Sequence, residues 1–170
     1  MTDRARVHQI SVNPDGGVPK HATPRAAVSP AGVFGDRQRN LKFHGGPDRA
    51  VCLFSMERIE ALRAEGHPIA PGTTGENLTI AGLDWDAVVP GARLGVGDAV
   101  ELEITAYTVP CQNIACSFAG RSFKRISQAV HPGWSRTYAR VLRGGVVSEG
   151  DAVVLTPPAN DAADTRRGGR

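Results

Sequence analysis

The sequence has little that would hold it in a membrane or cross-link it. Its 170 residues contain three cysteines, Cys52, Cys111 and Cys116, and no apolar run nears the roughly 20 residues of a membrane helix. The first ten residues, MTDRARVHQI, are charged and lack the apolar stretch of a signal peptide. We therefore expect reduced thiols, a cytoplasmic location and no membrane partner. Three cysteines also fall short of the four thiolates that usually hold an iron–sulfur cluster.

Aromatic residues are scarce as well, at 5%, and the net charge is only +3, too mild to indicate nucleic-acid binding. Hydrophobic residues nevertheless make up 41% of the chain, enough to form a core, and the length is that of one domain. The 20 glycines and 12 prolines favour many turns between short elements. The composition thus predicts a mainly β domain with a few helices.

Local patterns predict where the elements lie. Alternating or compact apolar residues predict strands at 7–12, 26–28, 50–54, 76–80, 91–105 and 136–142. Ser55 can cap a helix over 56–65 that stops at Gly66. A second helix is expected at 121–130, because Phe123, Ile126 and Val130 would share one face.

Turn residues complete this prediction. Arg143-Gly144-Gly145 should join 136–142 to Val146–Val147 as a hairpin. The phrases LGVGDAVEL at 94–102 and VSEGDAVVL at 147–155 predict two similar turns in one barrel. From Pro157 onward no apolar residue is larger than alanine, so we expect one domain over 1–156 and a disordered tail over 157–170.

A glycine-rich segment, KFHGGPDRAV at 42–51, has the composition of an anion-binding turn. Gly45 and Gly46 would let backbone N–H groups converge on a phosphate, and Lys42 and Arg49 would supply positive charge. A surface turn with scattered charges is the alternative.

Two further segments place polar residues where a ligand could bind. Glu76 and Asn77 stand where a loop becomes a strand, although Asn77 could equally cap an ordinary turn. Arg136, Tyr138 and Arg140 share one face of a predicted strand, which either lines a ligand site or faces solvent.

The three thiols have different settings. Cys111 directly follows Pro110 at the end of a predicted strand, among polar neighbours, and such a thiol can act as a nucleophile or a metal ligand. Cys52 lies in an apolar run and is expected to be an inert part of the core. The spacing of Cys111 and Cys116 is not that of a zinc site.

Taken together, the motifs resemble the MOSC domain, the fold of molybdenum-cofactor sulfurase C-terminal domains. The similar phrases span roughly residues 7–155 in the family's order: GDRQ at 35–38, KFHGGPDRAV at 42–51, GTTGENLT at 72–79, VGDAVELEIT at 96–105, PC at 110–111 and YARVLRGGVVSEGD at 138–151. The resemblance is strongest to stand-alone bacterial members that reduce N-hydroxylated compounds. It implies a barrel-like β domain.

The resemblance also implies a pocket for a molybdopterin-type molybdenum cofactor. Cys111 matches the family's cysteine, which ligates molybdenum in the reductases and carries a persulfide in the sulfurases. Lys42, Arg49 and the Gly45-Gly46 turn would then hold the cofactor phosphate. The other implied binding residues are Glu76 and Asn77 at the pterin ring and Arg136 and Tyr138 on the opposite wall. His44 could donate a proton, or only pack the turn.

The function implied is reduction of a small N-oxygenated molecule, such as a hydroxylamine, an amidoxime or an N-hydroxylated base. The alternative is a carrier of cofactor or persulfide sulfur in cofactor maturation, and a third interpretation is a β-barrel binding module with inert thiols. The chain has no room for the pyridoxal-phosphate domain of the sulfurases, and its cysteine count excludes a ferredoxin domain. Electrons or sulfur are therefore expected from a separate protein.

Overall fold

Two β-sheets dominate the structure, a computed structural model that describes residues 4–37 and 46–159. The larger sheet has the strand order β11-β7-β8-β9-β5-β6-β1-β2, and the smaller has the order β10-β3-β4. The strands are β1 (Arg6–Val12), β2 (His21–Thr23), β3 (Arg25–Ser29), β4 (Gly32–Val33), β5 (Val51–Ser55), β6 (Leu78–Ala81), β7 (Arg93–Val96), β8 (Val100–Tyr107), β9 (Thr137–Arg143), β10 (Gly145–Ser148) and β11 (Val153–Thr156). The prediction of a mainly β domain is confirmed.

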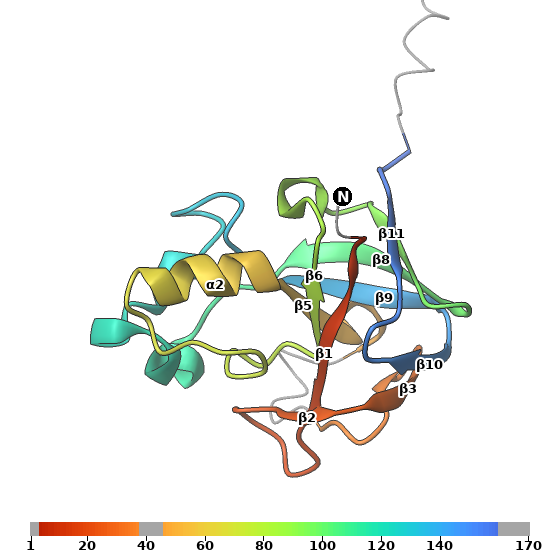
Figure 1. The fold of residues 1–170 in the computed structure, drawn as a ribbon, viewed down its shortest axis with the longest axis horizontal. Coiled ribbons are helices and arrows are strands. Elements are labelled where there is room, and N and C mark those ends of the chain that lie inside the picture. Colours follow the sequence, from red (N-terminus) through yellow and green to blue (C-terminus); the bar gives the residue numbers. More distant parts are fainter. Residues whose placement is uncertain (1–3, 38–45, 160–170) are drawn as a thin grey trace, which may run out of the picture.

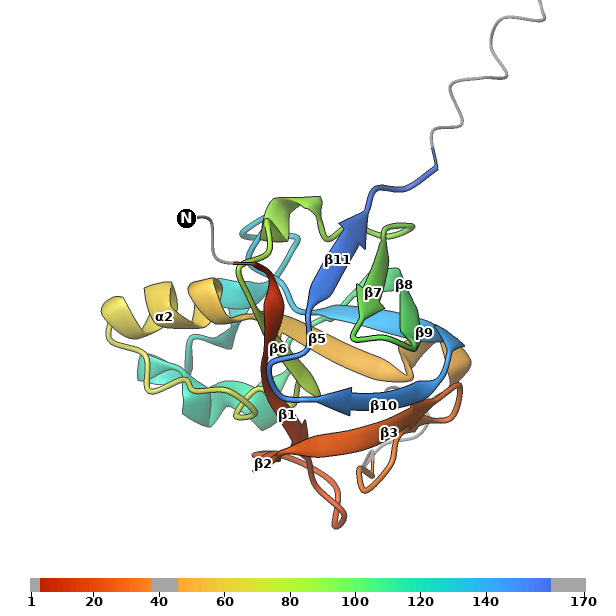
Figure 2. The same ribbon diagram turned by 45° about the vertical axis from the view of Figure 1, so that its right-hand side comes forward.

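The larger sheet curls so that β11, at one edge, approaches β1, the strand next to the other edge (Figure 2). Main-chain hydrogen bonds link β1 to the chain around β11, from Val7 N–H to Asp151 at 2.9 Å and from Val153 N–H to Ala5 at 2.9 Å. The two Gly-Asp turns also meet here, because Gly97 N–H donates to the Ala152 carbonyl at 2.9 Å. The fold is therefore barrel-like, as the sequence predicted.

The single α-helix in the described residues, α2 (Met56–Ala64), starts directly after β5. Ser55 caps it, since the Oγ atom accepts a hydrogen bond from Arg58 N–H at 3.1 Å. Ile59 and Leu62 are fully buried, so this face of the helix joins the core. Figure 1 shows α2 beside one end of the larger sheet, close to the short turns that follow β8.

The predicted helix over 121–130 is wrong. The chain instead forms short 3₁₀ turns over Gln112–Ser117, Ala119–Arg121 and Phe123–Ile126. Arg121 has a φ angle of 59°, and Ser122 and Ser127 have ψ angles of 54° and 127°, so the backbone leaves the helical region at both ends of the last turn. Ile126 is buried as expected, but Val130 is 55% exposed. The helical spacing of three apolar residues was therefore coincidental.

The predicted hairpin between 136–142 and 146–147 is also wrong. Strand β10 pairs with β3 of the smaller sheet, with Val146 opposite Ala27, while β9 stays between β8 and β5. Gly144 carries the chain from one sheet to the other past β3, where a Cβ would lie 2.6 Å from the Val28 carbonyl oxygen. The turn at Arg143-Gly144-Gly145 was predicted correctly, but β3, the partner of the strand that follows it, was not.

After β11 the described chain ends at Ala159, with Pro158 lying against Gly91. Residues 160–170 lie outside the described residues, so the tail and the domain boundary at 156 stay predictions. Within the described ranges, no helix has the length and apolar character needed to cross a membrane.

Candidate functional site

A cavity of about 430 Å³ lies where several distant segments meet at β5 and β9. Loop 13–20, loop 70–76 and the chain after β8 complete its walls. The residues that line it are Gly17, Val18, Lys20, Arg37, Cys52, Thr74, Gly75, Val109, Cys111, Asn113, Ile114, Arg136 and Tyr138. Three of them were singled out from the sequence: Cys111, Arg136 and Tyr138.

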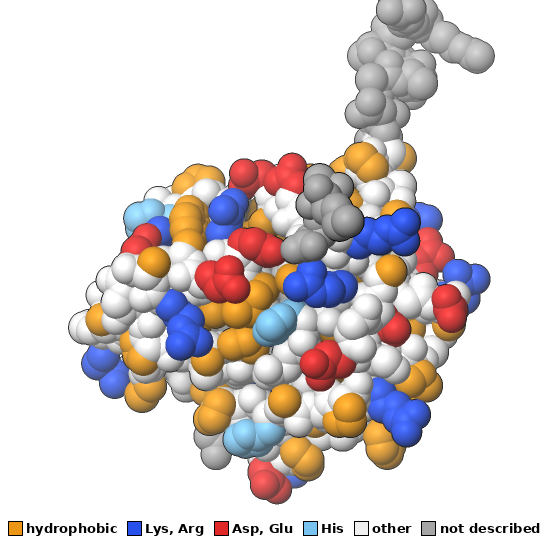
Figure 3. All heavy atoms as spheres, viewed as in Figure 1, with side chains coloured by type: hydrophobic (Ala, Val, Ile, Leu, Met, Phe, Trp, Pro, Cys, Tyr) orange, Lys and Arg blue, Asp and Glu red, His pale blue; other side chains and the backbone are white. Residues whose placement is uncertain are grey.

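Positive charge predominates in the cavity wall. Lys20, Arg37 and Arg136 line it, and no carboxylate is among its described lining residues. This is a local feature, because basic and acidic side chains are interspersed over the face of the molecule in Figure 3. The cavity therefore suits an anionic group.

Arg136 is one source of the cavity's preference for an anionic group. Its side chain is only 6% exposed, and its Nη1 donates a hydrogen bond to the Thr74 carbonyl. Its Nε has no hydrogen-bond partner among the described residues. A buried guanidinium N–H without an acceptor is costly. Arg136 also lines the cavity, where an anionic group would pair with its charge.

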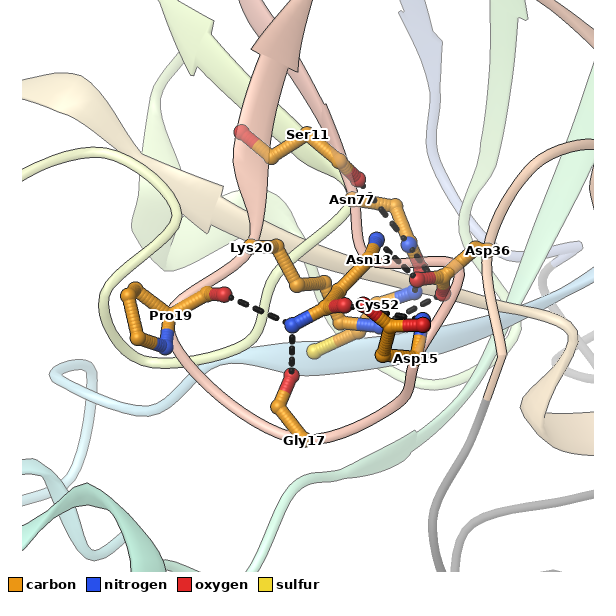
Figure 4. A network of polar contacts seen from close by, with 9 residues as sticks. All are labelled: Ser11, Asn13, Asp15, Gly17, Pro19, Lys20, Asp36, Cys52 and Asn77. Carbon is orange, nitrogen blue, oxygen red and sulfur yellow. Dashed lines mark hydrogen bonds and ion pairs between the residues drawn. The ribbon is translucent and has the colours of Figure 1, made fainter.

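Lys20 is a second buried cation, with its Nζ 2.5 Å from a carboxylate oxygen of Asp36 (Figure 4). The Lys20 main chain is fixed as well, since its N–H donates to the Gly72 carbonyl at 2.9 Å. Gly72 has a φ angle of 85°, and a Cβ there would clash with the Lys20 carbonyl oxygen. Only glycine allows loop 70–76 to approach Lys20 so closely.

Two thiols face the cavity. Cys111 is half-buried and precedes the 3₁₀ turn Gln112–Ser117, whereas Cys116 is exposed and does not line the cavity. Cys52 of β5 is 5% exposed and also lines the cavity, with its Sγ 3.8 Å from Thr108 Oγ1. Burial raises the pKa of the Cys52 thiol, which favours its neutral form. The assignment of Cys52 to the core alone is therefore corrected.

Tyr138 stands opposite Cys52 in the β9–β5 ladder, so both side chains reach the same cavity. Burial raises the pKa of Tyr138 to about 12, and its phenol keeps its proton at neutral pH. The Arg49 guanidinium lies 5.5 Å from the centre of the Tyr138 ring. Arg49 is not a lining residue, but it stands on the cavity side of the domain.

Arg140, the third residue of the predicted strand face, lies away from the cavity. Its guanidinium pairs with Glu103 and Asp48 at 3.6 and 3.5 Å. The polar face of β9 therefore divides, with Arg136 and Tyr138 in the cavity and Arg140 at the surface.

Glu76 and Asn77 are buried but do not line the cavity. Glu76 accepts hydrogen bonds from Gly72 N–H at 2.7 Å and from Thr74 Oγ1 at 2.6 Å, and so shapes loop 70–76. Asn77 Oδ1 accepts from Cys52 N–H at 3.0 Å. Their side chains hold the walls, and the contact with a pterin ring that the resemblance implies stays a prediction.

The glycine-rich segment is only partly visible. Lys42, His44 and Gly45 lie outside the described residues. Gly46 has a φ angle of 94° and leads into the short turn Pro47–Arg49, which positions Arg49 directly before β5.

Sequence analysis missed Lys20, Arg37, Asn113 and the carboxylate of Asp36. Lys20 lies in a loop rich in proline and glycine, with no local pattern that marks it as buried. Asp36 and Arg37 belong to the GDRQ phrase, which was noted for the resemblance but assigned no role.

The structure is thus a barrel-like β domain whose cavity is lined by cations and a half-buried thiol. The chain belongs to the MOSC domain family, whose model matches residues 40–154. The resemblance seen in the sequence is therefore confirmed.

Curated relatives agree with this assignment. YflK of Bacillus subtilis is 33% identical over 117 residues, which are 68% of this chain and 52% of YflK. YiiM of Escherichia coli is 30% identical over 91 residues, 51% of this chain and 40% of YiiM. The chain thus spans about half the length of the curated relatives it matches.

Solved structures show the same fold. YiiM from Geobacillus stearothermophilus superposes with a TM-score of 0.66 and 25% identity, over 89% of this chain and 75% of that one. YuaD of Bacillus subtilis gives a TM-score of 0.71 at 16% identity, over 92% and 98% of the two chains. At that identity YuaD supports the fold alone.

Proposed function

We propose that the cavity binds a molybdopterin-type cofactor and that the protein reduces a small N-oxygenated substrate there. One observation carries the proposal: the half-buried Cys111 and the buried, incompletely bonded Arg136 line the same 430 Å³ cavity. A soft thiolate and a fixed guanidinium are the two groups that a thiophilic metal and a phosphate require.

The residues present fit such a cofactor. Lys20 and Arg136 suit its phosphate, with Arg37 also in the wall and Arg49 beside it. Within residues 4–37 and 46–159 no three His, Cys, Asp or Glu side chains converge on one point. A cofactor whose own dithiolene sulfurs bind the metal needs only one protein thiolate, which Cys111 can provide.

When bound, such a cofactor supplies an acceptor for the substrate oxygen in a two-electron reduction. The chain's own residues would bind and orient the reactants. Val109 and Asn113 flank Cys111 at the cavity, where a substrate must approach, and the Tyr138 phenol retains a proton close by. His44 remains the sequence-based candidate for a proton donor. A separate protein would deliver the electrons.

A carrier of cofactor or persulfide sulfur is the second candidate. It is favoured by the half-buried state of Cys111, which leaves the thiol open to a partner, and by the second thiol, Cys52, in the same cavity. In this case the partner would be a sulfur donor instead of an electron donor.

Metal analysis separates the two functions. Protein is purified from a host that makes the cofactor, and molybdenum, released pterin and turnover of a hydroxylamine with reduced methyl viologen are measured. If the protein is a reductase, we expect stoichiometric molybdenum and turnover. Both should be lost in Cys111→Ser and retained in the matched control Cys116→Ser. Metal-free protein that gains one sulfur atom on Cys111 from a desulfurase would instead establish the carrier. Normal metal content and turnover in Cys111→Ser would leave the reductase function standing but refute Cys111 as its metal ligand.

A further inference from the structure

A buried carboxylate, Asp36, is bonded to Lys20, one of the residues that line the cavity (Figure 4). Its side chain is 6% exposed. One oxygen, Oδ2, accepts hydrogen bonds from Lys20 Nζ at 2.5 Å and from Asn77 Nδ2 at 2.8 Å, while Oδ1 accepts from Asn13 N–H at 2.9 Å. The carboxylate is thus bonded on both oxygens without being a lining residue itself.

The three partners of Asp36 come from two parts of the chain, loop 13–20 and the residue that precedes β6. Lys20 lines the cavity from loop 13–20, and the Asn13 side chain braces that loop by donating to the Pro19 carbonyl at 3.1 Å. Asn77 connects Asp36 to β5, because its Oδ1 accepts from Cys52 N–H. Figure 4 shows these groups converging on the Asp36 carboxylate.

Asp36 also supplies the counter-charge that a buried ammonium needs. A lysine ammonium has three N–H donors, and the bond to Asp36 fixes its position while the side chain still borders the cavity. Without this bond, the long lysine side chain would be free to turn away toward water.

We propose that Asp36 is a positioning residue of the anion site. Asp36 holds Lys20 Nζ against the cavity and ties loop 13–20 to β5. This inference deepens the proposed function, since it concerns the residue that prepares the cavity for the anionic end of the ligand. The ligand class is a phosphate or phosphate monoester, which accepts hydrogen bonds from Lys20 and Arg136 together.

For Asp36→Asn, the proposal predicts weaker phosphate binding, whereas the change in net charge alone predicts stronger binding. Asp36→Asn removes one negative charge near the cavity, so long-range electrostatics alone would strengthen anion binding. Loss of the charged anchor for Lys20 would weaken it. Asp15, an exposed carboxylate on the same loop whose main-chain N–H bonds Asn13, gives a matched control: Asp15→Asn makes the same charge change without touching Lys20.

Titration calorimetry with inorganic phosphate at fixed low ionic strength tests this. We expect Asp36→Asn to bind phosphate on the order of tenfold more weakly than the wild type, the scale of a hydrogen bond to a charged group. Asp15→Asn should bind equally or slightly more tightly. Lys20→Met should lose affinity too, and Asp36→Asn/Lys20→Met should be no weaker than Lys20→Met alone, because Asp36 acts through Lys20.

The alternatives have distinct outcomes. If Asp36→Asn binds as tightly as the wild type while Lys20→Met is weakened, Asp36 does not position Lys20, although the cation site of the proposed function stands. Additive losses in the double variant would assign Asp36 a general structural role and overturn the inference.

If Asp36→Asn does not fold, Asp36→Glu, which keeps the charge but moves the carboxylate, should still weaken phosphate binding. If the wild-type protein does not bind phosphate, the inference is overturned. Its molybdenum content and hydroxylamine turnover would then show separately whether the proposed function holds.

Discussion

Cys52 contributes to both the core and the cavity. Its neighbours Val51 and Leu53 are fully buried, and its own side chain borders the cavity beside Thr108. Apolar neighbours in the sequence therefore predicted its burial correctly but not the open space that it faces. A thiol in this position contributes packing while remaining available to a ligand of sufficient size.

We expect Cys52→Ser to be tolerated with a modest loss of stability. A serine C–O bond is shorter than a cysteine C–S bond, so the new hydroxyl would lie too far from Thr108 Oγ1 for a hydrogen bond unless the chain shifts, and its burial would cost ~1–3 kcal/mol. Urea denaturation measures the change, with the exposed Cys116→Ser as control, expected to stay within ~0.5 kcal/mol of the wild type. A change no larger than that of the control would mean that the serine hydroxyl finds a hydrogen-bond partner.

At the scale of elements, an ion pair joins the end of α2 to the 3₁₀ turns that follow β8. Arg125 contacts Glu65 through two hydrogen bonds of 3.0 and 2.7 Å and lies 4.0 Å from the centre of the Trp134 ring. His67 Nδ1 accepts from Ala119 N–H at 3.0 Å. These contacts hold the segment that carries Cys111 and Asn113 against the helix.

This pairing predicts a pH-dependent contribution to stability. The hydrogen bond from Arg125 lowers the pKa of Glu65 below its ordinary value of 4.5, so the pair stabilises the fold above that pH and loses its effect as pH falls through the lowered value. The carboxylate is 41% exposed, which limits the contribution to ~0.5 kcal/mol.

Glu65→Gln should therefore lower the free energy of unfolding at pH 7, and the loss should be smaller at pH 3. Denaturant unfolding at both pH values measures this, with Glu60→Gln, exposed on the same helix, as the control. An equal loss at both pH values would show that Glu65 acts through packing and not through its charge.

Elements were predictable where the signal was local. The helix after Ser55 was predicted because its cap, its apolar spacing and its terminal glycine all lie within twelve residues. Strand β10 was found, but not its partner, because pairing with β3 joins residues more than a hundred positions apart. The helix over 121–130 was wrongly predicted because apolar spacing alone does not reveal the non-helical backbone angles of Ser122 and Ser127.

At the scale of the whole molecule, the site was predictable only in part, because local sequence patterns do not show which distant residues meet. Cys111 and Tyr138 were found because strand ends and strand faces can be read locally. Lys20 and Asp36 are 16 positions apart and meet only when the chain between them folds back, and each looks like an ordinary loop residue in the sequence. The family motifs therefore marked the region of the cavity, while its buried cations had to come from the structure.

The last prediction concerns the end of the chain. Pro158 lies against Gly91, where a Cβ would be 3.3 Å from the proline ring, so the domain's contacts extend slightly past β11. Residues 160–170 hold no apolar side chain larger than alanine and could add little burial. Truncation after Ala159 should leave the melting temperature unchanged, whereas truncation after Thr156 should cost ~0.5 kcal/mol through loss of the proline contact. Calorimetric melting of the two shortened chains beside the full chain measures both effects. A fall of several degrees on removing 160–170 alone would mean that this segment docks on the domain and is not the disordered tail predicted from the sequence.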